Sequence, residues 1–262
     1  MADKSTGKQK DITVLVTGAS SGIGQAIAGR LLDEGYRVIV MARRESRLAD
    51  FVAALGPAAR CAMAVADVTD RPGTHAALAA LPEPFRAIDV LVNNAGLALG
   101  LDRAAEADFT DWETMINVNC TALAWLTREL LPAMVERRRG HVVNIGSTAA
   151  LYPYRGGNAY GATKAFVAQF SLNLRADLLG TPIRTTLIEP GLVGGSEFSD
   201  VRFHGDADSA KAVYAGTEPL TPADVADAVA WALNQPAHVN VNRIELMPVC
   251  QAADQIGLAR QS

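Results

Sequence analysis

Thr17-Gly18-Ala19-Ser20-Ser21-Gly22-Ile23-Gly24 is the stretch that decides the fold, because it joins a short apolar run to a helix-like segment. Residues 12–16 before it have the length of a buried strand, and residues 25–32 after it have a helical pattern. Glycines let the backbone approach a pyrophosphate closely, and the free amides and dipole of the following helix favour that anion. The Gly-x-x-x-Gly-x-Gly spacing only approximates the usual dinucleotide pattern, and a structural turn is the alternative. Its position after the first strand favours a dinucleotide site.

Short apolar runs alternate with helix-length amphipathic segments along the whole chain. Six further runs have the character of buried strands: residues 38–41, 61–65, 88–92, 141–145, 183–188 and 243–247. A helical period over residues 48–55 stops at Gly56, and Thr221 precedes Pro222 and Asp224 as the N-cap of a later helix. Strand and helix in alternation predict one α/β domain, with a parallel sheet and helices on both faces.

Composition and charge argue against several classes of protein. A net charge of −4 over 262 residues gives no electrostatic reason to bind nucleic acid or an anionic membrane, and no window approaches the roughly 20 apolar residues of a membrane span. The three cysteines, Cys61, Cys120 and Cys250, form no Cys-x-x-Cys motif, and the four histidines are isolated. A disulfide framework and a metal site are therefore not expected. We expect residues 1–11 to be a polar tail and the protein to be soluble and cytoplasmic.

Tyr160 and Lys164 lie four residues apart, downstream of Ser147. On a helix this spacing places the ammonium beside the phenol. A cation beside a phenol favours the phenolate, which lowers a pKa that is ordinarily about 10 toward the range useful for proton transfer. Ser147 follows a strand-like run and offers a hydroxyl to the same substrate oxygen. A solvated Tyr-x-x-x-Lys face is the alternative, but the glycine turn favours acid–base chemistry.

Arg43 and Arg44 follow the second predicted strand, where an NAD site carries an acidic residue. Two guanidinium groups suit a 2′-phosphate, and the missing carboxylate removes the repulsion that would exclude it. NADP is therefore expected over NAD. The alternative is that both arginines form a solvated turn with Glu45.

Several motifs occur together in the order found in short-chain dehydrogenases/reductases: the glycine turn, Asn93-Asn94-Ala95-Gly96, Ser147, Tyr160-x-x-x-Lys164 and Pro190-Gly191. The chain resembles this family from residue 12 to residue 248. The resemblance implies a Rossmann-type, doubly wound sheet of seven parallel strands and hydride transfer between a substrate carbon and nicotinamide.

Residues 144–148, 153–166 and 188–203 are similar to one group in this family, the NADP-dependent 3-hydroxy acid dehydrogenases. That group oxidises serine, allo-threonine and other 3-hydroxy acids such as 3-hydroxypropionate, and reduces malonic semialdehyde. Alternatives are a reductase of an acyl-carrier ketone, steroid or sugar alcohol, and a non-catalytic NADP-binding protein. A hydrolase using Ser147 is disfavoured, because no Gly-x-Ser-x-Gly elbow surrounds it.

The resemblance also implies roles for individual residues. Tyr160 is the acid or base, and Lys164 lowers the Tyr160 pKa and binds the nicotinamide ribose. Ser147 holds the substrate oxygen, and Asn119 supports Lys164 through a water. Asn119 bonding only a neighbouring turn is the alternative. The implied cofactor residues are Gly18, Ala19, Ser20, Ser21, Gly22 and Ile23 (pyrophosphate and adenine ribose), Arg43 and Arg44 (2′-phosphate), Asp67 and Val68 (adenine), Asn94, Ala95 and Gly96 (floor), and Pro190, Gly191 and Val193 (carboxamide). The alternatives are that Asp67 caps a turn and that Asn94 stabilises the sheet, but the family resemblance favours cofactor binding.

A small hydroxy acid also needs a partner for its carboxylate, and arginine supplies two parallel hydrogen bonds. Arg202 is the first candidate and Arg155 the second, with a surface pair to Asp200 or Asp206 as the alternative for Arg202. Arg202 lies in the loop-like residues 191–216, expected to be a substrate lid. The family resemblance also implies a homotetramer built through helices over residues 112–136 and 157–179. Ser196 arrives later after Pro190-Gly191 than the family's hydroxyl residue, which leaves its contact with nicotinamide open.

Overall fold

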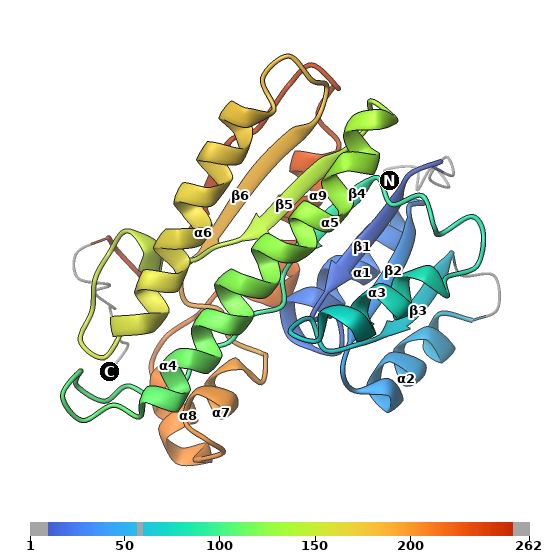
Figure 1. Cartoon of the computed structure of the whole chain (residues 1–262). Coiled ribbons are helices and arrows are strands. Elements are labelled where there is room, and N and C mark those ends of the chain that lie inside the picture. The colour runs from blue at the N-terminus through green and yellow to red at the C-terminus, as the bar shows by residue number, and fades with distance from the viewer. Residues whose placement is uncertain (1–9, 57–59, 254–262) are drawn as a thin grey trace, which may run out of the picture.

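The computed structural model describes residues 10–56 and 60–253, and its centre is a parallel sheet in the order β3-β2-β1-β4-β5-β6-β7 (Figure 1). Every predicted apolar run overlaps one strand, and the predicted Rossmann-type α/β fold with seven parallel strands is confirmed. The strands are β1 (Thr13–Thr17), β2 (Arg37–Ala42), β3 (Cys61–Val65), β4 (Val90–Asn93), β5 (His141–Ile145), β6 (Arg184–Pro190) and β7 (Arg243–Leu246).

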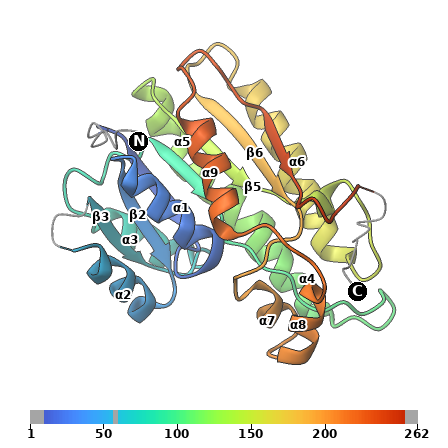
Figure 2. The ribbon, with the colours of Figure 1, turned by 180° about the vertical axis from the view of Figure 1, so that it is seen from behind.

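Helices cover both faces of this sheet. They are α1 (Gly22–Asp33), α2 (Glu45–Leu55), α3 (Arg71–Ala79), α4 (Phe109–Ile116), α5 (Leu123–Glu136), α6 (Asn158–Asp177), α7 (Phe198–Arg202), α8 (Ala207–Tyr214) and α9 (Pro222–Leu233). Figure 1 shows α5 and α6 in front of the sheet, and Figure 2, from behind, shows α1 and α9 on the opposite face. None of the described helices combines the length and the hydropathy needed to cross a lipid bilayer.

Alternate residues of the central strands build two separate apolar cores. Val14 and Val16 pack in the cluster that holds Ile27 of α1 and Val229 of α9. Leu15 points the other way, into the cluster that includes residues of α5 and α6. Side chains of a strand alternate between its faces, so a strand covered on both sides must be apolar throughout. This is why the strands read as unbroken apolar runs.

The predicted start of the last helix is confirmed by its cap. Thr221 Oγ1 accepts a hydrogen bond from the Asp224 amide at 3.3 Å, and the Thr221 amide donates to Asp224 Oδ2 at 2.7 Å. This reciprocal pair is a capping box, with Pro222 in the first turn. The predicted stop at Gly56 is also observed, since Gly56 caps α2 with a φ of +79° that favours glycine.

The loop expected over residues 191–216 contains two short helices, α7 and α8. Asp206 starts α8, because its carboxylate accepts hydrogen bonds from the amides of Asp208 and Ser209. We call residues 191–216 the lid segment. The helix expected over residues 112–136 instead begins at Phe109 and is interrupted by a π-helical turn, Asn117–Ala122.

The predicted N-terminal tail falls mostly on residues 1–9, which lie outside the described residues. Its last two residues contact the domain. Lys10 Nζ lies 3.1 Å from Glu34 Oε2 and 2.6 Å from Asn234 Oδ1, and Asp11 forms an ion pair with Arg37.

Candidate active site

The predicted site segments meet at one edge of the sheet, because all its strands are parallel and each segment follows a strand. The glycine turn follows β1, the arginine pair β2, Asp67 and Val68 β3, and Asn94 to Gly96 β4. Ser147 comes two residues after β5, and the loop from Pro190 begins at the end of β6. Strand order reverses between β1 and β4, which is where doubly wound sheets open a crevice for ligands.

The glycine turn brings its backbone close to the loop after β4. Gly18 and Gly22 have φ values of +66° and +54°. A Cβ on Gly24 would lie 2.4 Å from the Gly18 carbonyl oxygen, so only glycine permits this packing of α1 on the turn. The first amides of α1 then face the crevice, where they suit a phosphate group.

Asn94 connects the loop after β4 to the glycine turn after β1 through hydrogen bonds. Its Nδ2 donates to the carbonyl oxygens of Thr17 at 2.9 Å and Gly18 at 3.3 Å, while the Asn94 and Ala95 amides both donate to Thr17 Oγ1 at 3.0 Å. These bonds support the structural reading of Asn94. They also hold the Gly18 turn beside Ala95 and Gly96, the arrangement that a dinucleotide site requires.

The arginine pair lies beside the glycine turn, but its two members differ. Arg44 donates from Nη2 to Ser20 Oγ and Ser21 Oγ, each at 3.0 Å. Arg43 is 70% exposed, and its Nη1 lies 3.6 Å from Asp67 Oδ2. Asp67 also caps a local turn by accepting from the amide and the hydroxyl of Thr69. The residues around this corner therefore fit an anionic group on the adenosine side of a dinucleotide.

Tyr160 and Lys164 both lie on the buried face of α6, as their spacing predicts. Lys164 Nζ lies 5.9 Å from the centroid of the Tyr160 ring and donates to the Ile145 carbonyl at 2.9 Å. Ser147 begins a short 3₁₀ turn, where its Oγ accepts from the Ala149 amide at 3.1 Å. The structure therefore brings the three predicted residues together from β5 and α6.

Burial dominates the ionisation of this group. It raises the pKa of Tyr160 to about 12, an effect reinforced by Tyr154 and opposed by a hydrogen bond with Ser147 and by the charge of Arg202. Burial also lowers the pKa of Lys164 to about 8. The expectation that Lys164 lowers the Tyr160 pKa is wrong for the protein without its cofactor, because that pKa is raised and Lys164 is not among the groups that lower it. Tyr160 is a neutral phenol at physiological pH and is ready to donate a proton.

Asn119 lies in the π-helical turn and faces Lys164 across Gly96. A Cβ on Gly96 would lie 3.1 Å from Asn119 Oδ1 and 3.5 Å from Lys164 Nζ. Asn119 exchanges two hydrogen bonds with the backbone of Leu97 and donates to Thr163 Oγ1 at 3.0 Å. Insertions of π-helix often mark functional sites. Asn119 is buried in this turn, with 1% exposure.

Arg202 of α7 lies beside Tyr160. Its guanidinium carbon lies 5.5 Å from the Tyr160 ring centroid, and Nη2 donates to the Tyr154 hydroxyl at 2.5 Å. No ion pair joins Arg202 to Asp200 or Asp206 among the described residues, so the surface alternative is not observed. Arg155, the second candidate, is exposed.

Sequence reasoning missed several residues around the site. Phe198 packs edge-on against Tyr160, with ring centroids 5.9 Å apart. Gln251 Oε1 accepts from the Leu192 amide at 2.8 Å, and a Cβ on Gly191 would lie 2.1 Å from that oxygen. Ser196, whose contact the sequence left open, lies against the glycine turn, since a Cβ on Gly22 would approach Ser196 Cβ to 2.9 Å. No spacing rule links these partners, because they come from distant segments.

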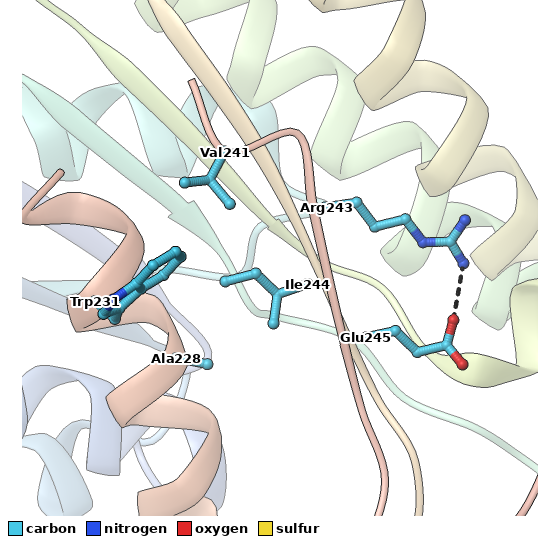
Figure 3. Close-up of a pocket in the computed structure, with 6 residues that line it drawn as sticks. All are labelled: Ala228, Trp231, Val241, Arg243, Ile244 and Glu245. Carbon is cyan, nitrogen blue, oxygen red and sulfur yellow. Dashed lines mark hydrogen bonds and ion pairs between the residues drawn. The ribbon is translucent and has the colours of Figure 1, made fainter. Parts of the chain in front are cut away.

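Glu189 is a fully buried carboxylate beside the site, one residue before Pro190. A Cβ on Gly146 would lie 2.9 Å from Glu189 Cγ, and Arg243 of β7 forms an ion pair with its Oε2. Figure 3 shows Arg243 paired with Glu245, and both residues line an open hollow of about 520 Å³ together with Trp231 and Ile244. Burial raises the pKa of Glu189 to about 7, which Arg243 opposes.

Glu189→Gln is expected to stabilise the protein at pH 8 by about 1–2 kcal/mol and far less at pH 5. The Glu189 pKa is about 7 in the folded state and 4.5 ordinarily, so its stabilising contribution is complete below pH 4.5 and lost as the pH rises through 7. Glutamine keeps the shape without the buried charge. Urea unfolding at both pH values measures the difference, and Glu245→Gln, at a 30% exposed side chain, is the control with little effect. An equal change at both pH values would contradict the assignment.

Comparison with known proteins agrees with this geometry. A family model described as short chain dehydrogenase matches residues 12–205. A Salmonella typhi protein named NADP-dependent 3-hydroxy acid dehydrogenase is 55% identical over 239 residues, which cover 91% of this chain and 96% of that protein. An Agrobacterium fabrum serine 3-dehydrogenase is 48% identical over 251 residues, 95% of this chain and 99% of the relative.

A solved structure shows the same fold. It is described as the closed form of serine dehydrogenase complexed with NADP+, and it matches with a TM-score of 0.91 and 52% identity over 95% of this chain and 100% of that one. The matched family model also spans the glycine turn, the Ser147, Tyr160 and Lys164 set and the start of the lid segment. The chain therefore belongs to the short-chain dehydrogenase family.

Proposed function

We propose that the chain is an NADP-dependent oxidoreductase that transfers a hydride between NADP(H) and the 3-hydroxyl or 3-oxo carbon of a small 3-hydroxy acid. The substrates are of the serine, allo-threonine, and 3-hydroxypropionate or malonic semialdehyde type. One observation carries the substrate class: the Arg202 guanidinium lies 5.5 Å from the Tyr160 ring centroid. A cation at this place holds a carboxylate next to the reacting hydroxyl. Relatives named for 3-hydroxy acids and for serine support the same class.

In carbonyl reduction, the neutral Tyr160 phenol donates the proton and Ser147 donates a hydrogen bond to the oxygen where charge develops. In alcohol oxidation the same phenol must take the proton, so positive charge nearby is required to oppose the effect of burial. Arg202 contributes part of that charge. When bound, the nicotinamide accepts or donates the hydride, and its oxidised form adds positive charge. Lys164 and Asn119 orient the ribose end and extend the proton path.

NADP preference rests on the corner beside the glycine turn. Arg44 is held by Ser20 and Ser21, and Arg43 is largely exposed beside it, paired with Asp67 at 3.6 Å. Guanidinium groups bind phosphate bidentately, whereas the ribose hydroxyl of NAD gains nothing comparable from them. The cofactor residues implied by the family resemblance all lie at this edge of the sheet, and the relatives named as NADP-dependent agree.

The side chains around Tyr160 favour a small substrate. Tyr154 and Phe198 pack in the same cluster as Tyr160, together with the fully buried Met115. Two aromatic rings and a guanidinium packed close to Tyr160 suit a compact hydroxy acid better than a steroid or an acyl carrier. The lid segment, which carries both Phe198 and Arg202, is proposed to close over that substrate.

A side-by-side assay tests the proposal. NADP and NAD reduction are measured with L-serine, allo-threonine, 3-hydroxypropionate, 3-hydroxyisobutyrate and 2-propanol. We expect activity with NADP and the acids. Activity with NAD alone would overturn the cofactor assignment, and activity with 2-propanol alone would overturn the carboxylate assignment.

Arg202→Leu is expected to lower the ratio of kcat/KM for 3-hydroxypropionate to that for 2-propanol by about 100-fold, since a hydrogen-bonded charge pair of this kind is worth about 2–5 kcal/mol. The ratio is used because Arg202 also acts on the Tyr160 pKa, which affects every substrate. Arg155→Leu removes an exposed arginine from the loop before α6 and is expected to leave the ratio within twofold. A larger effect for Arg155→Leu would move the carboxylate partner there.

We further propose a homotetramer in the cytoplasm. Apolar side chains stand exposed on α4 and α6, among them Phe109 at 64%, Phe166 at 42% and Leu172 at 53%. Patches of this kind commonly mark subunit contacts. The three cysteines are free, which suits a reducing compartment. Light scattering tests the assembly, and a monomeric mass would overturn it.

A further inference from the structure

Glu197, the residue before α7, reaches from the lid segment to the arginine corner. Its Oε2 lies 2.7 Å from Arg44 Nη2, and its Oε1 lies 3.5 Å from Arg47 Nη2. Hydrogen bonding with Arg44 is the main cause that holds the Glu197 pKa below its ordinary value. The carboxylate is therefore ionised at neutral pH and bridges two guanidinium groups, of which Arg44 lies 153 positions away in the chain.

The groups around this carboxylate form a site for an anion. Arg44 Nη2 donates to Ser20 Oγ and Ser21 Oγ at 3.0 Å, so its guanidinium is fixed in place beside the glycine turn. Two guanidinium groups and two hydroxyls are the donors that bind phosphate oxygens. The Glu197 carboxylate already occupies one of these donors, the Arg44 guanidinium. An ADP-ribose 2′-phosphate at this corner needs the same Arg44.

We propose that Glu197 determines cofactor specificity by competing with the 2′-phosphate for Arg44, which lowers the affinity for NADP but not for NAD. The inference rests on the proposed NADP site. If the carboxylate leaves, its ion pair with Arg44 is lost, and if it stays, its negative charge opposes a phosphate that carries close to two charges. A 2′-hydroxyl is neutral and meets no such opposition. The competition for Arg44 also couples NADP binding to the lid segment. Displacing Glu197 breaks its ion pairs with Arg44 and Arg47, which connect the start of α7 to α2.

The fold does not depend on this contact. The Arg44 and Glu197 side chains are 44% and 38% exposed, and such pairs contribute about 0–1 kcal/mol to stability. Glu197→Gln keeps the side chain's size and some hydrogen bonding while removing its charge. The variant is thus expected to fold like the wild type, which circular dichroism and urea unfolding verify.

Titration calorimetry with four ligands tests the inference: NADP, NAD, 2′,5′-ADP and 5′-AMP. Glu197→Gln is expected to bind NADP and 2′,5′-ADP roughly 3–10-fold more tightly, with NAD and 5′-AMP within twofold. Asp200→Asn is the matched control, because it removes one charge from α7, three residues after Glu197, at a carboxylate with no ion pair among the described residues. It is expected to change none of the four affinities beyond twofold.

Arg44→Ala is a second variant, which tests whether the effect of Glu197→Gln depends on Arg44. In an Arg44→Ala background the effect of Glu197→Gln on NADP binding is expected to vanish, since the competition needs Arg44. Unchanged or weaker NADP binding by Glu197→Gln, or an equal gain for NAD, would overturn the inference. A wild type that prefers NAD would overturn the proposed NADP site itself. A wild type that prefers NADP, with no change in Glu197→Gln, would overturn the Glu197 inference alone.

Discussion

Tyr160→Phe is expected to lower kcat by about 10³-fold in both directions, because positioned acid–base groups contribute roughly 10²–10⁴. Only the hydroxyl is removed. The phenylalanine ring keeps the edge-on contact with Phe198 and the face presented to Arg202. NADP binding is therefore expected to change by less than about threefold. Steady-state assays and calorimetry measure the two effects separately.

The matched control is Tyr36→Phe, at a second buried tyrosine. Tyr36 is 2% exposed, and its hydroxyl donates to Asn234 Oδ1 at 3.0 Å, away from the strand ends that carry the site. Its loss is expected to leave kcat within twofold. If Tyr160→Phe kept more than a tenth of the wild-type kcat, another group would have to move the proton.

Most of the fold could be predicted from sequence because the inner strands β1, β2, β4 and β5 are buried on both faces and the edge strand β3 is still an apolar run. Cys61–Val65 and His141–Ile145 match the predicted runs residue for residue. The lid helices were missed for a physical reason: α7 and α8 span five and eight residues, too short to show a helical period above noise. The Asp206 cap was the one local signal of α8.

The site was predictable where a residue's function depends on the strand that it follows. Ser147, the glycine turn and the arginine pair are all carried to one edge by the parallel sheet. Contacts between distant segments were not predictable. Arg202 meets Tyr154 across 48 positions, and Glu197 meets Arg44 across 153. The Tyr160 pKa also depends on burial, which no local spacing reports.

Lys164→Met is expected to lower kcat/KM by about 10²–10³-fold, the usual cost of removing one preorganised charged donor from an active site. Lys164 Nζ lies beside the Tyr160 ring and next to Gly96, where the ribose end of the cofactor is proposed to bind. Methionine fills a similar volume without the charge. A loss of activity alone would not separate a functional lysine from one needed for folding.

Stability separates these two roles, because burial lowers the Lys164 pKa from 10.5 to about 8. A group with a depressed folded-state pKa contributes stability that is complete above its unfolded value and is lost as the pH falls through the folded value. The wild type therefore carries the buried cation at pH 7, and Lys164→Met is expected to be about 1–2 kcal/mol more stable there, after the lost bond to Ile145 is counted. At pH 10 that advantage should disappear. Urea unfolding at both pH values measures it, with Lys211→Met, at an exposed lysine, as control. If Lys164→Met were less stable than the wild type at pH 7, Lys164 would be a structural residue. If Lys164→Met is inactive but more stable, the buried charge serves the reaction at the expense of the fold.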